Sequence, residues 1–315
     1  MDASLTRETY EHLIAHGGGL PATPTAIVHP CDAPSLGGAM AAAKAGLIAP
    51  ILVGPEKRIR RAAAEAGIDI SGLPIVDTPH SHASAAQAVA LVRAGRAAAL
   101  MKGSLHTDEV LEAVMNHETG IRTERRISHV FVMDVPTYPK PLLITDAAVN
   151  IAPTLDEKVD IVVNAIGLAH AIGIARPKVA ILSAVEMVTS KIPSTIDAAA
   201  LCKMADRGQI TGALLDGPLG FDNAISREAA AIKHIVSPVA GRANILVVPD
   251  LEAGNMLAKS LSFLAGAESA GIVLGARVPI ILTSRADSLI SRIGSCAVAS
   301  LVAARRRQTT GGVIR

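Results

Sequence analysis

A serine and an arginine end an apolar run in the stretch ILTSRADS, residues 281–288. A helical pattern of apolar residues follows, and Asp287 is well placed as its N-cap. A hydroxyl, a guanidinium and the amides of a helix N-terminus together suit an oxyanion or a phosphate. Ser284, Arg285 and Asp287 are therefore candidate catalytic residues. The same pattern also fits a plain N-cap beside a solvated arginine.

A second polar turn lies in LMKGSLHT, residues 100–107. The ammonium of Lys102 and the backbone amides near Gly103 can hold a phosphate, with Thr107 close behind. The G-x-x-x-x-G-K-[ST] pattern of a Walker A loop is absent, and an ordinary strand-to-helix turn capped by Thr107 fits equally well. Arg122 begins a group of three arginines in GIRTERR (120–126), which can bind phosphate bidentately or form a solvated face.

A third polar turn follows the apolar run that ends at Pro249. Ligands of open α/β sheets bind at the carboxyl ends of the strands. The polar and glycine residues directly after this run are therefore candidate binding residues. They are Asp250, Glu252, Gly254 and Asn255.

Short apolar runs alternate with alanine-rich helical windows along the chain. Runs that are apolar throughout predict parallel strands covered on both faces, and the alternation predicts a doubly wound α/β fold. The clearest helix is expected over 155–172, because Thr154 and Glu157 form a capping box and Gly173 follows it. The expected strands are 25–30, 50–54, 98–103, 129–135, 142–147, 178–183, 212–217, 244–250 and 278–284.

The length of 315 residues exceeds a typical single core, so two domains are expected. The proline-rich stretch 135–141 and the stretch 276–279 are the expected crossing points between them. The first α/β domain would then be discontinuous, with residues 1–138 plus 280–315, and the second would span 139–279. Ligands of such folds commonly bind in the cleft between the domains.

The charge balance is nearly even, with 30 basic and 28 acidic residues. It favours neither nucleic acid nor anionic membranes as a partner. The apolar runs are shorter than the roughly 20 residues of a membrane-spanning helix, and the N-terminal stretch lacks the apolar segment of a secretory signal. Three scattered cysteines suit a reducing compartment. We therefore expect a cytoplasmic protein that binds neither nucleic acid nor membrane.

Several stretches of the sequence, named at the end of this paragraph in chain order, together resemble the phosphate acetyl/butyryltransferase family over roughly residues 25–305. The resemblance implies transfer of an acetyl or butyryl group between coenzyme A and inorganic phosphate. It also implies two α/β/α domains like those of isocitrate and isopropylmalate dehydrogenases, an active site in the cleft and a homodimer. Coenzyme A is then a substrate, and no permanently bound cofactor or metal is implied. The stretches are LMKG (100–103), GIRT (120–123), ITDAAVNIAP (144–153), DGPLGFDNAIS (216–226), VVPDLEAGN (247–255) and TSRADS (283–288).

The resemblance also implies roles for the candidate residues. Ser284 would hydrogen-bond the charge that develops on sulfur or oxygen, and Arg285 would hold the phosphoryl group. The acetyl branch carries an acid seven residues after the serine. Here that place is Ser291, which leaves Asp287 as the nearest carboxylate. Arg122 would contact phosphate or coenzyme A, and the PDLEAGN stretch would form a wall near the substrate. The acyl preference and the physiological direction stay open.

Two alternatives remain at the level of sequence. One is a metal-dependent, decarboxylating dehydrogenase of the same fold, for which Asp216, Asp222 and Asp250 could supply ligands, although no spacing joins them. The other is a non-catalytic coenzyme A-binding protein, suggested by the absence of an acid at Ser291.

Overall fold

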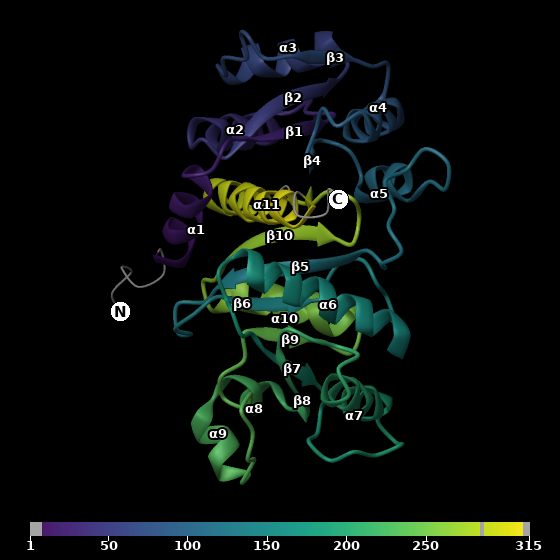
Figure 1. Cartoon of the computed structure of the whole chain (residues 1–315). Coiled ribbons are helices and arrows are strands. Elements are labelled where there is room, and N and C mark those ends of the chain that lie inside the picture. Colours follow the sequence, from purple (N-terminus) through teal and green to yellow (C-terminus); the bar gives the residue numbers. More distant parts are fainter. Residues whose placement is uncertain (1–7, 284–286, 311–315) are drawn as a thin grey trace. The chain divides into compact units, whose positions relative to one another are not determined.

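The structure is a computed structural model that describes residues 8–283 and 287–310 (Figure 1). The chain divides into two compact units, residues 10–125 with 270–315, and residues 1–9 with 126–269. This division and the domains expected from the sequence assign residues 1–9, 126–138 and 270–279 differently, and the domain boundaries stay a prediction. Both units are α/β, as expected.

The unit of residues 10–125 and 270–315 contains a largely parallel sheet in the order β3-β2-β1-β4-β11-β10. Its neighbours are parallel except β10 and β11, which form an antiparallel pair. The strands are β1 (Thr23–Val28), β2 (Ile48–Gly54), β3 (Ile75–Asp77), β4 (Ala99–Lys102), β10 (Glu268–Leu274, which begins two residues before this unit) and β11 (Ile280–Ile281).

Small residues let the helices of this unit approach closely. A Cβ on Gly294 in α11 would lie 2.0 Å from Cε1 of the buried Tyr10 in α1, so only glycine fits there. The helix α11 also packs against α2. The helices are α1 (Glu8–Gly18), α2 (Ala33–Lys44), α3 (Glu56–Ala66), α4 (Ser81–Arg93), α5 (Thr107–Met115) and α11 (Leu289–Thr310).

The strands of the unit of residues 126–269 are hydrogen-bonded in the order β5-β6-β9-β7-β8. Only the β5–β6 pair is antiparallel. Its strands are β5 (Ser128–Asp134), β6 (Leu142–Thr145), β7 (Lys178–Leu182), β8 (Leu214–Leu219) and β9 (Ile245–Val247). Its helices are α6 (Leu155–Ala171), α7 (Pro193–Asp206), α8 (Phe221–Ile225), α9 (Arg227–Ile232) and α10 (Leu251–Leu264).

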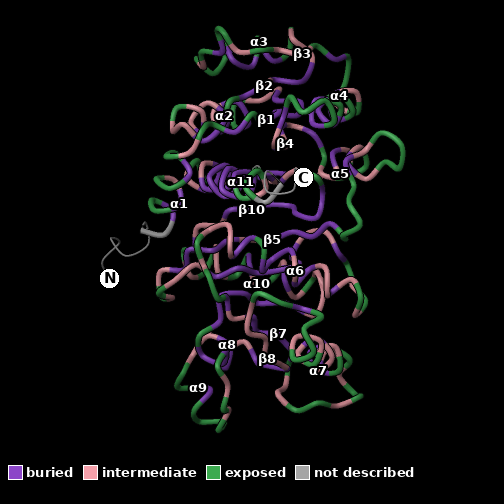
Figure 2. The backbone as a smooth tube through the Cα atoms, in the orientation of Figure 1, coloured by how far each residue is buried: buried purple, intermediate pink, exposed green. Residues whose placement is uncertain are grey.

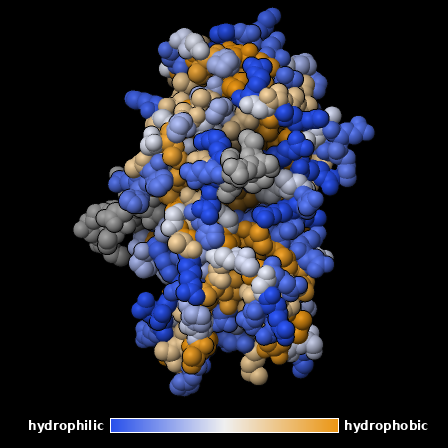
Figure 3. All heavy atoms as spheres, viewed as in Figure 1, coloured by the Kyte–Doolittle hydropathy of each residue, from blue (hydrophilic) through white to orange (hydrophobic). Residues whose placement is uncertain are grey.

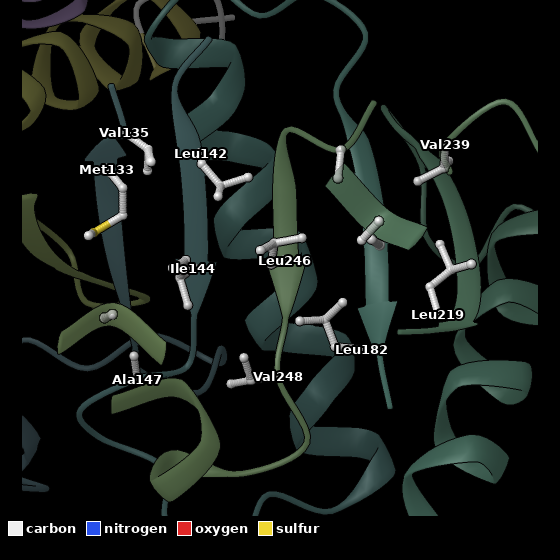
Figure 4. Packing of buried hydrophobic residues seen from close by; sticks show 14 of the residues in the cluster. Met133, Val135, Leu142, Ile144, Ala147, Leu182, Leu219, Val239, Leu246 and Val248 are labelled. Atoms are coloured by element: carbon white, nitrogen blue, oxygen red, sulfur yellow. The ribbon is translucent and has the colours of Figure 1, made fainter. Parts of the chain in front are cut away.

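A hydrophobic core covers one face of these five strands. Leu142 and Ile144 of β6 lie beside Leu246 of β9, with Met133 of β5 further along the same face (Figure 4). Figure 2 shows that the strands are largely buried, whereas the exposed residues follow the helices and loops. Burial on both faces explains why these strands are apolar throughout.

The helix expected over 155–172 is confirmed as α6. The Thr154 hydroxyl accepts the N–H of Glu157 at 3.4 Å, and the Glu157 carboxylate accepts the N–H of Thr154 at 2.9 Å. Gly173, with φ of 93°, follows the helix. These contacts span only a few residues, which is why the sequence predicts them well.

Each of the nine expected strand ranges contains a strand, but two strands were missed. β3 has only three residues, and β10 begins with the polar residues Glu268 and Ser269. The strands are largely parallel, as expected, and the antiparallel exceptions are the β5–β6 and β10–β11 pairs. A buried antiparallel pair has the same apolar pattern as a buried parallel one, so periodicity cannot separate them.

The close packing at Gly294 gives a matched test. We expect Gly294→Ala to lower the free energy of unfolding by about 1–3 kcal/mol, because the Tyr10 ring must move away from the added methyl group. Gly167→Ala in α6 is the control, since nothing lies within 4 Å of its Cβ position, and it should raise stability by about 0.5–1 kcal/mol. Urea titrations of both variants check this, and equal effects would contradict the packing argument.

Candidate active site

Strand register brings the ends of β1, β4 and β11 to one edge of the sheet in the unit of residues 10–125 and 270–315. Val28 of β1 pairs with Lys102 of β4, and Ile281 of β11 pairs with Met101 of β4. Because the three strands are parallel, their carboxyl ends lie at the same edge. Lys102 and Thr283 therefore leave neighbouring strands at this edge. Ser284 and Arg285 lie outside the described residues, directly after Thr283.

The ends of β1 and β4 approach so closely that only glycine fits at position 103. A Cβ on Gly103 would lie 2.4 Å from the Val28 carbonyl oxygen and 2.8 Å from that of His29. The Gly103 N–H donates to the Val28 carbonyl at 2.9 Å. The N–H and hydroxyl of Ser104 both donate to the His29 carbonyl, at 3.0 and 2.8 Å. The two turns thus form one hydrogen-bonded unit.

The half-buried Lys102 ammonium stays at the strand end, where its Nζ donates to the Gly103 carbonyl at 3.3 Å. Thr107 does not cap the following helix. It is the first residue of α5, His106 occupies the N-cap, and the Glu109 carboxylate accepts the His106 N–H at 3.0 Å. With Asp108 also in this first turn, the start of α5 is negatively charged and disfavours a phosphate. A phosphate is better placed beside Lys102 and Gly103.

His29, which sequence reasoning did not single out, lies at the same sheet edge. It follows β1 with φ of 54°, and its Nδ1 lies 3.0 Å from the hydroxyl of Ser84, which in turn lies 2.9 Å from that of Thr78. Burial, together with the positive charge of Arg58, lowers the pKa of His29, so its ring is neutral near pH 7. A histidine before a proline carries no local sequence signal that it will be buried at a strand end.

The start of α11 differs from the expectation. α11 begins at Leu289, and the Ser288 hydroxyl accepts the N–H of Ser291 at 3.1 Å, so Ser288 holds the N-cap position predicted for Asp287. The prediction was wrong by one residue, because a serine and an aspartate cap equally well. Asp287 itself is half-buried, and Ser291 is buried in the first turn.

A buried arginine, also missed from the sequence, supports the end of β11. Arg292 in α11 is 5% exposed, and its Nη1 donates to the Thr283 hydroxyl at 3.1 Å. This bond ties the residue directly before Ser284 to the helix that follows the turn. Arg292 therefore positions the chain on which the predicted catalytic residues lie.

Arg122 projects from a firmly held segment of the same unit. A Cβ on Gly120 would lie 2.3 Å from the Asn116 carbonyl oxygen. The buried Ile121 accepts the N–H of Arg277 at 2.9 Å, and the Thr123 hydroxyl bonds the Gly275 carbonyl. Arg122 itself is exposed, with Nη1 at 2.8 Å from Nε2 of His117.

The PDLEAGN stretch packs against the loop after β6 in the unit of residues 126–269. A Cβ on Gly254 would lie 2.7 Å from the Asp146 carbonyl oxygen, and the Asn255 amide donates to the Ala147 carbonyl at 3.2 Å. Asp250 is the N-cap of α10 and accepts the N–H of Ala253 at 2.8 Å. Glu252 is exposed.

The loop after β6 is built around the buried carboxylate of Asp146. It accepts the N–H groups of Ala148 and Val149 at 2.9 and 3.0 Å, and those of His129 and Asn150 at 3.2 Å. Full burial lowers the pKa of His129 to about 4, partly opposed by the Asp146 charge. The loop that Gly254 and Asn255 contact is therefore rigid.

The described residues include no cluster of three or more His, Cys, Asp or Glu side chains arranged to hold a metal ion. None of the described helices is both long and apolar enough to cross a membrane.

Comparison with known proteins identifies the family. The model of the family described as phosphate acetyl/butaryl transferase matches residues 81–300. A phosphate acetyltransferase from Rhizobium meliloti is 66% identical over 298 residues, which cover 95% of this chain and 94% of the relative. The chain belongs to this transferase family. A phosphate butyryltransferase from Clostridium acetobutylicum is 44% identical, covering 87% of this chain and 91% of the relative.

Solved structures share the fold of the transferase. A branched-chain phosphotransacylase from Enterococcus faecalis V583 has a TM-score of 0.78 at 33% identity, covering 89% of this chain and 99% of the other. A 4-hydroxythreonine-4-phosphate dehydrogenase from Burkholderia phymatum has a TM-score of 0.55 at 13% identity, covering 89% and 98%, which shows the fold alone. The family and fold class predicted from the sequence are confirmed.

All candidate site residues of the transferase lie within the matched range of 81–300. The structure brings Lys102 and Gly103 to the same sheet edge as the end of β11. In the other unit it joins Gly254 and Asn255 to the loop after β6. No described contact joins Arg122 to Lys102.

The capping role of Asp250 can be separated from any role in the reaction. Asp250→Ala should lower the free energy of unfolding by about 1 kcal/mol, because the Ala253 N–H loses its acceptor. Asp250→Asn keeps an acceptor oxygen and should retain the stability. If Asp250→Asn is as stable as the wild type but has a much lower kcat, the carboxylate acts beyond the cap. Thermal unfolding and steady-state kinetics on both variants decide this.

The Arg292–Thr283 bond predicts a difference between two conservative variants. Thr283→Val removes the hydroxyl acceptor from a buried guanidinium and should cost about 1–3 kcal/mol of stability. Thr283→Ser keeps the hydroxyl and should cost less than half as much. Turnover should fall with Thr283→Val, since the chain leading to Ser284 is no longer held. Equal stability and turnover in both variants would show that the bond does not position this turn.

Proposed function

We propose that this chain transfers an acetyl group, rather than a butyryl group, between coenzyme A and inorganic phosphate. The observation that carries the acetyl preference is the 66% identity to the phosphate acetyltransferase from Rhizobium meliloti over 95% of the chain. The identity to the butyryltransferase from Clostridium acetobutylicum is 44%. Coenzyme A and its acyl thioester are substrates in this proposal, and no resident cofactor takes part.

The reaction proceeds by direct attack. The thiolate sulfur of coenzyme A bonds to the carbonyl carbon of acetyl phosphate, and the resulting tetrahedral oxyanion collapses as the carbon–oxygen bond to phosphate breaks. In the reverse direction a phosphate oxygen attacks the thioester and the thiolate leaves. Neither direction requires a covalent bond to the enzyme, so orientation and charge stabilisation supply the catalysis.

The sheet edge formed by β4 and β11 supports the assignment of roles. Ser284 donates a hydrogen bond to the developing negative charge, and Arg285 binds the phosphoryl oxygens. Lys102 and the amides near Gly103, which leave the neighbouring strand, contribute to the same phosphate site. Asp287 is the nearest carboxylate that follows Ser284, and it accepts the proton of the coenzyme A thiol. The hydroxyl of Ser291 cannot serve as this base.

The remaining candidates contribute to substrate binding in this proposal. Arg122 contacts phosphate groups of coenzyme A or the free phosphate, and Thr107 contributes to coenzyme A binding away from the phosphate groups. The stretch that contains Asp250, Glu252, Gly254 and Asn255 contributes to acyl and coenzyme A binding; its rigid contact with the loop after β6 supports this role.

We also propose that the enzyme is a cytoplasmic homodimer. Large apolar side chains are strongly exposed in α10, where Met256, Phe263 and Leu264 are 62%, 81% and 88% accessible. Figure 3 shows hydrophobic side chains at the surface among the charged ones. A second copy of this chain is the occupant that we propose for this face of α10.

Phosphate-dependent thiol release tests the function. We expect release from acetyl-coenzyme A to exceed that from butyryl-coenzyme A, without added metal. Ser284→Ala should lower kcat by about 100–1,000-fold with little change in stability, because the developing charge loses its donor. Arg285→Ala should raise the KM for phosphate, and the exposed Ser71→Ala is the control.

Each result bears on a different part of the proposal. Faster release from butyryl-coenzyme A would contradict the acetyl preference. Wild-type turnover in Ser284→Ala would show that the site is assigned wrongly. If no acyl-coenzyme A releases thiol in the presence of phosphate, the chain does not catalyse the family reaction.

A further inference from the structure

Four basic side chains gather around the short segment 241–244 in the unit of residues 126–269. They are Lys140, Lys178, Arg227 and Arg242. The Lys140 ammonium donates to the backbone carbonyl of Arg242. A Cβ on Gly241 would lie 2.6 Å from the Cα of Arg227, so the two backbones are in direct contact.

Backbone hydrogen bonds hold Lys178 beside the same segment. The Lys178 N–H donates to the side-chain oxygen of Asn244 at 3.0 Å, and the Asn244 N–H donates to the Lys178 carbonyl at 2.8 Å. Tyr138 completes the cluster, because its hydroxyl donates to the Ala243 carbonyl at 2.6 Å and its ring lies 5.8 Å from the Lys140 Nζ. The four basic residues are therefore brought together from parts of the chain that are far apart in sequence.

The cluster lies at the sheet edge opposite to the candidate site residues of this unit. Lys178 is the first residue of β7, Lys140 lies just before β6, and the segment 241–244 leads into β9. These three strands are parallel, so their amino ends share one edge. The loop after β6 and the start of α10, which contain the motif residues, follow the carboxyl ends of the strands. The cluster is thus separate from the residues assigned to acyl transfer.

Within residues 8–283 and 287–310, none of the four forms an ion pair with an acidic side chain. Burial and then the charges of Lys178, Arg227 and Arg242 lower the pKa of Lys140 to about 8. Like charges this close repel one another. A bound anion would remove that repulsion.

We propose that Lys140, Lys178, Arg227 and Arg242 form a binding site for a phosphate-bearing anion, separate from the acyl-transfer site. Guanidinium groups bind phosphate oxygens bidentately, and Lys140 adds a point charge whose position is held by the Arg242 carbonyl. The Lys140 ammonium and the backbones of Lys178, Arg227 and Arg242 lie at a single four-residue segment, which fits a compact anion. Free phosphate and the phosphate chain of a nucleotide share this chemistry.

Equilibrium dialysis with radiolabelled inorganic phosphate tests the proposal on the full chain. At low ionic strength we expect two phosphates to bind per wild-type chain. In the double variant Lys140→Gln/Arg242→Gln, the affinity of one of them should fall by roughly tenfold or more. The control Lys191→Gln/Arg207→Gln removes two exposed cations of the same unit and should still bind two phosphates. Higher salt should weaken phosphate binding at the basic cluster, because the basic side chains are partly exposed.

One further variant and one further ligand complete the binding experiment. Arg227→Gln changes an exposed side chain that makes no described ion pair, so it reports on the site if the double variant unfolds. Labelled ATP distinguishes the source: tighter binding than phosphate, lost in the same variants, indicates a nucleotide. The proposal is overturned if the wild-type chain binds a single phosphate and its ATP binding is the same in all variants. It is also overturned if the test and control variants bind phosphate equally. Binding of only an acidic peptide to this surface overturns it too.

Discussion

The close approach of the ends of β1 and β4 is the constraint on which the candidate site of residues 10–125 and 270–315 depends. The Val28 and His29 carbonyls accept hydrogen bonds from the backbone of Gly103 and Ser104, and no side chain at position 103 would fit between them. This contact places Lys102 at a defined point on the edge. Parallel register then adds the end of β11, so Thr283, directly before Ser284, follows the neighbouring strand at the same edge.

The other unit achieves rigidity in a different way. A buried carboxylate is costly unless it is hydrogen-bonded, and Asp146 accepts several N–H groups of its own loop. The loop is therefore organised around one charge. Gly254 then allows α10 to pack directly on this loop, which links the PDLEAGN motif to the strand ends. The family motif thus contains residues that shape the backbone as well as candidates for substrate contact.

A family motif does not by itself make each of its residues catalytic. Asp250 caps α10, and Ser291, in the place where the acetyl branch has an acid, bonds to Ser288 in the first turn of α11. These roles are structural. Conversely, Arg292 lies outside the quoted motifs, yet it holds the residue before Ser284. Its burial suits a guanidinium that acts on the chain rather than on the substrate.

Features that depend on neighbouring residues can be predicted from the amino-acid sequence alone. Both the family and the α/β class follow from local motifs and apolar runs, and the capping box at Thr154 is made by residues three apart. The tertiary structure decided what depends on distant residues: the antiparallel pairs, the neutral buried His29, and the bond from Arg292. It also gathered the cations around segment 241–244. Capping is a contact within one turn of chain, whereas strand order and burial are set by packing between segments that no local pattern relates.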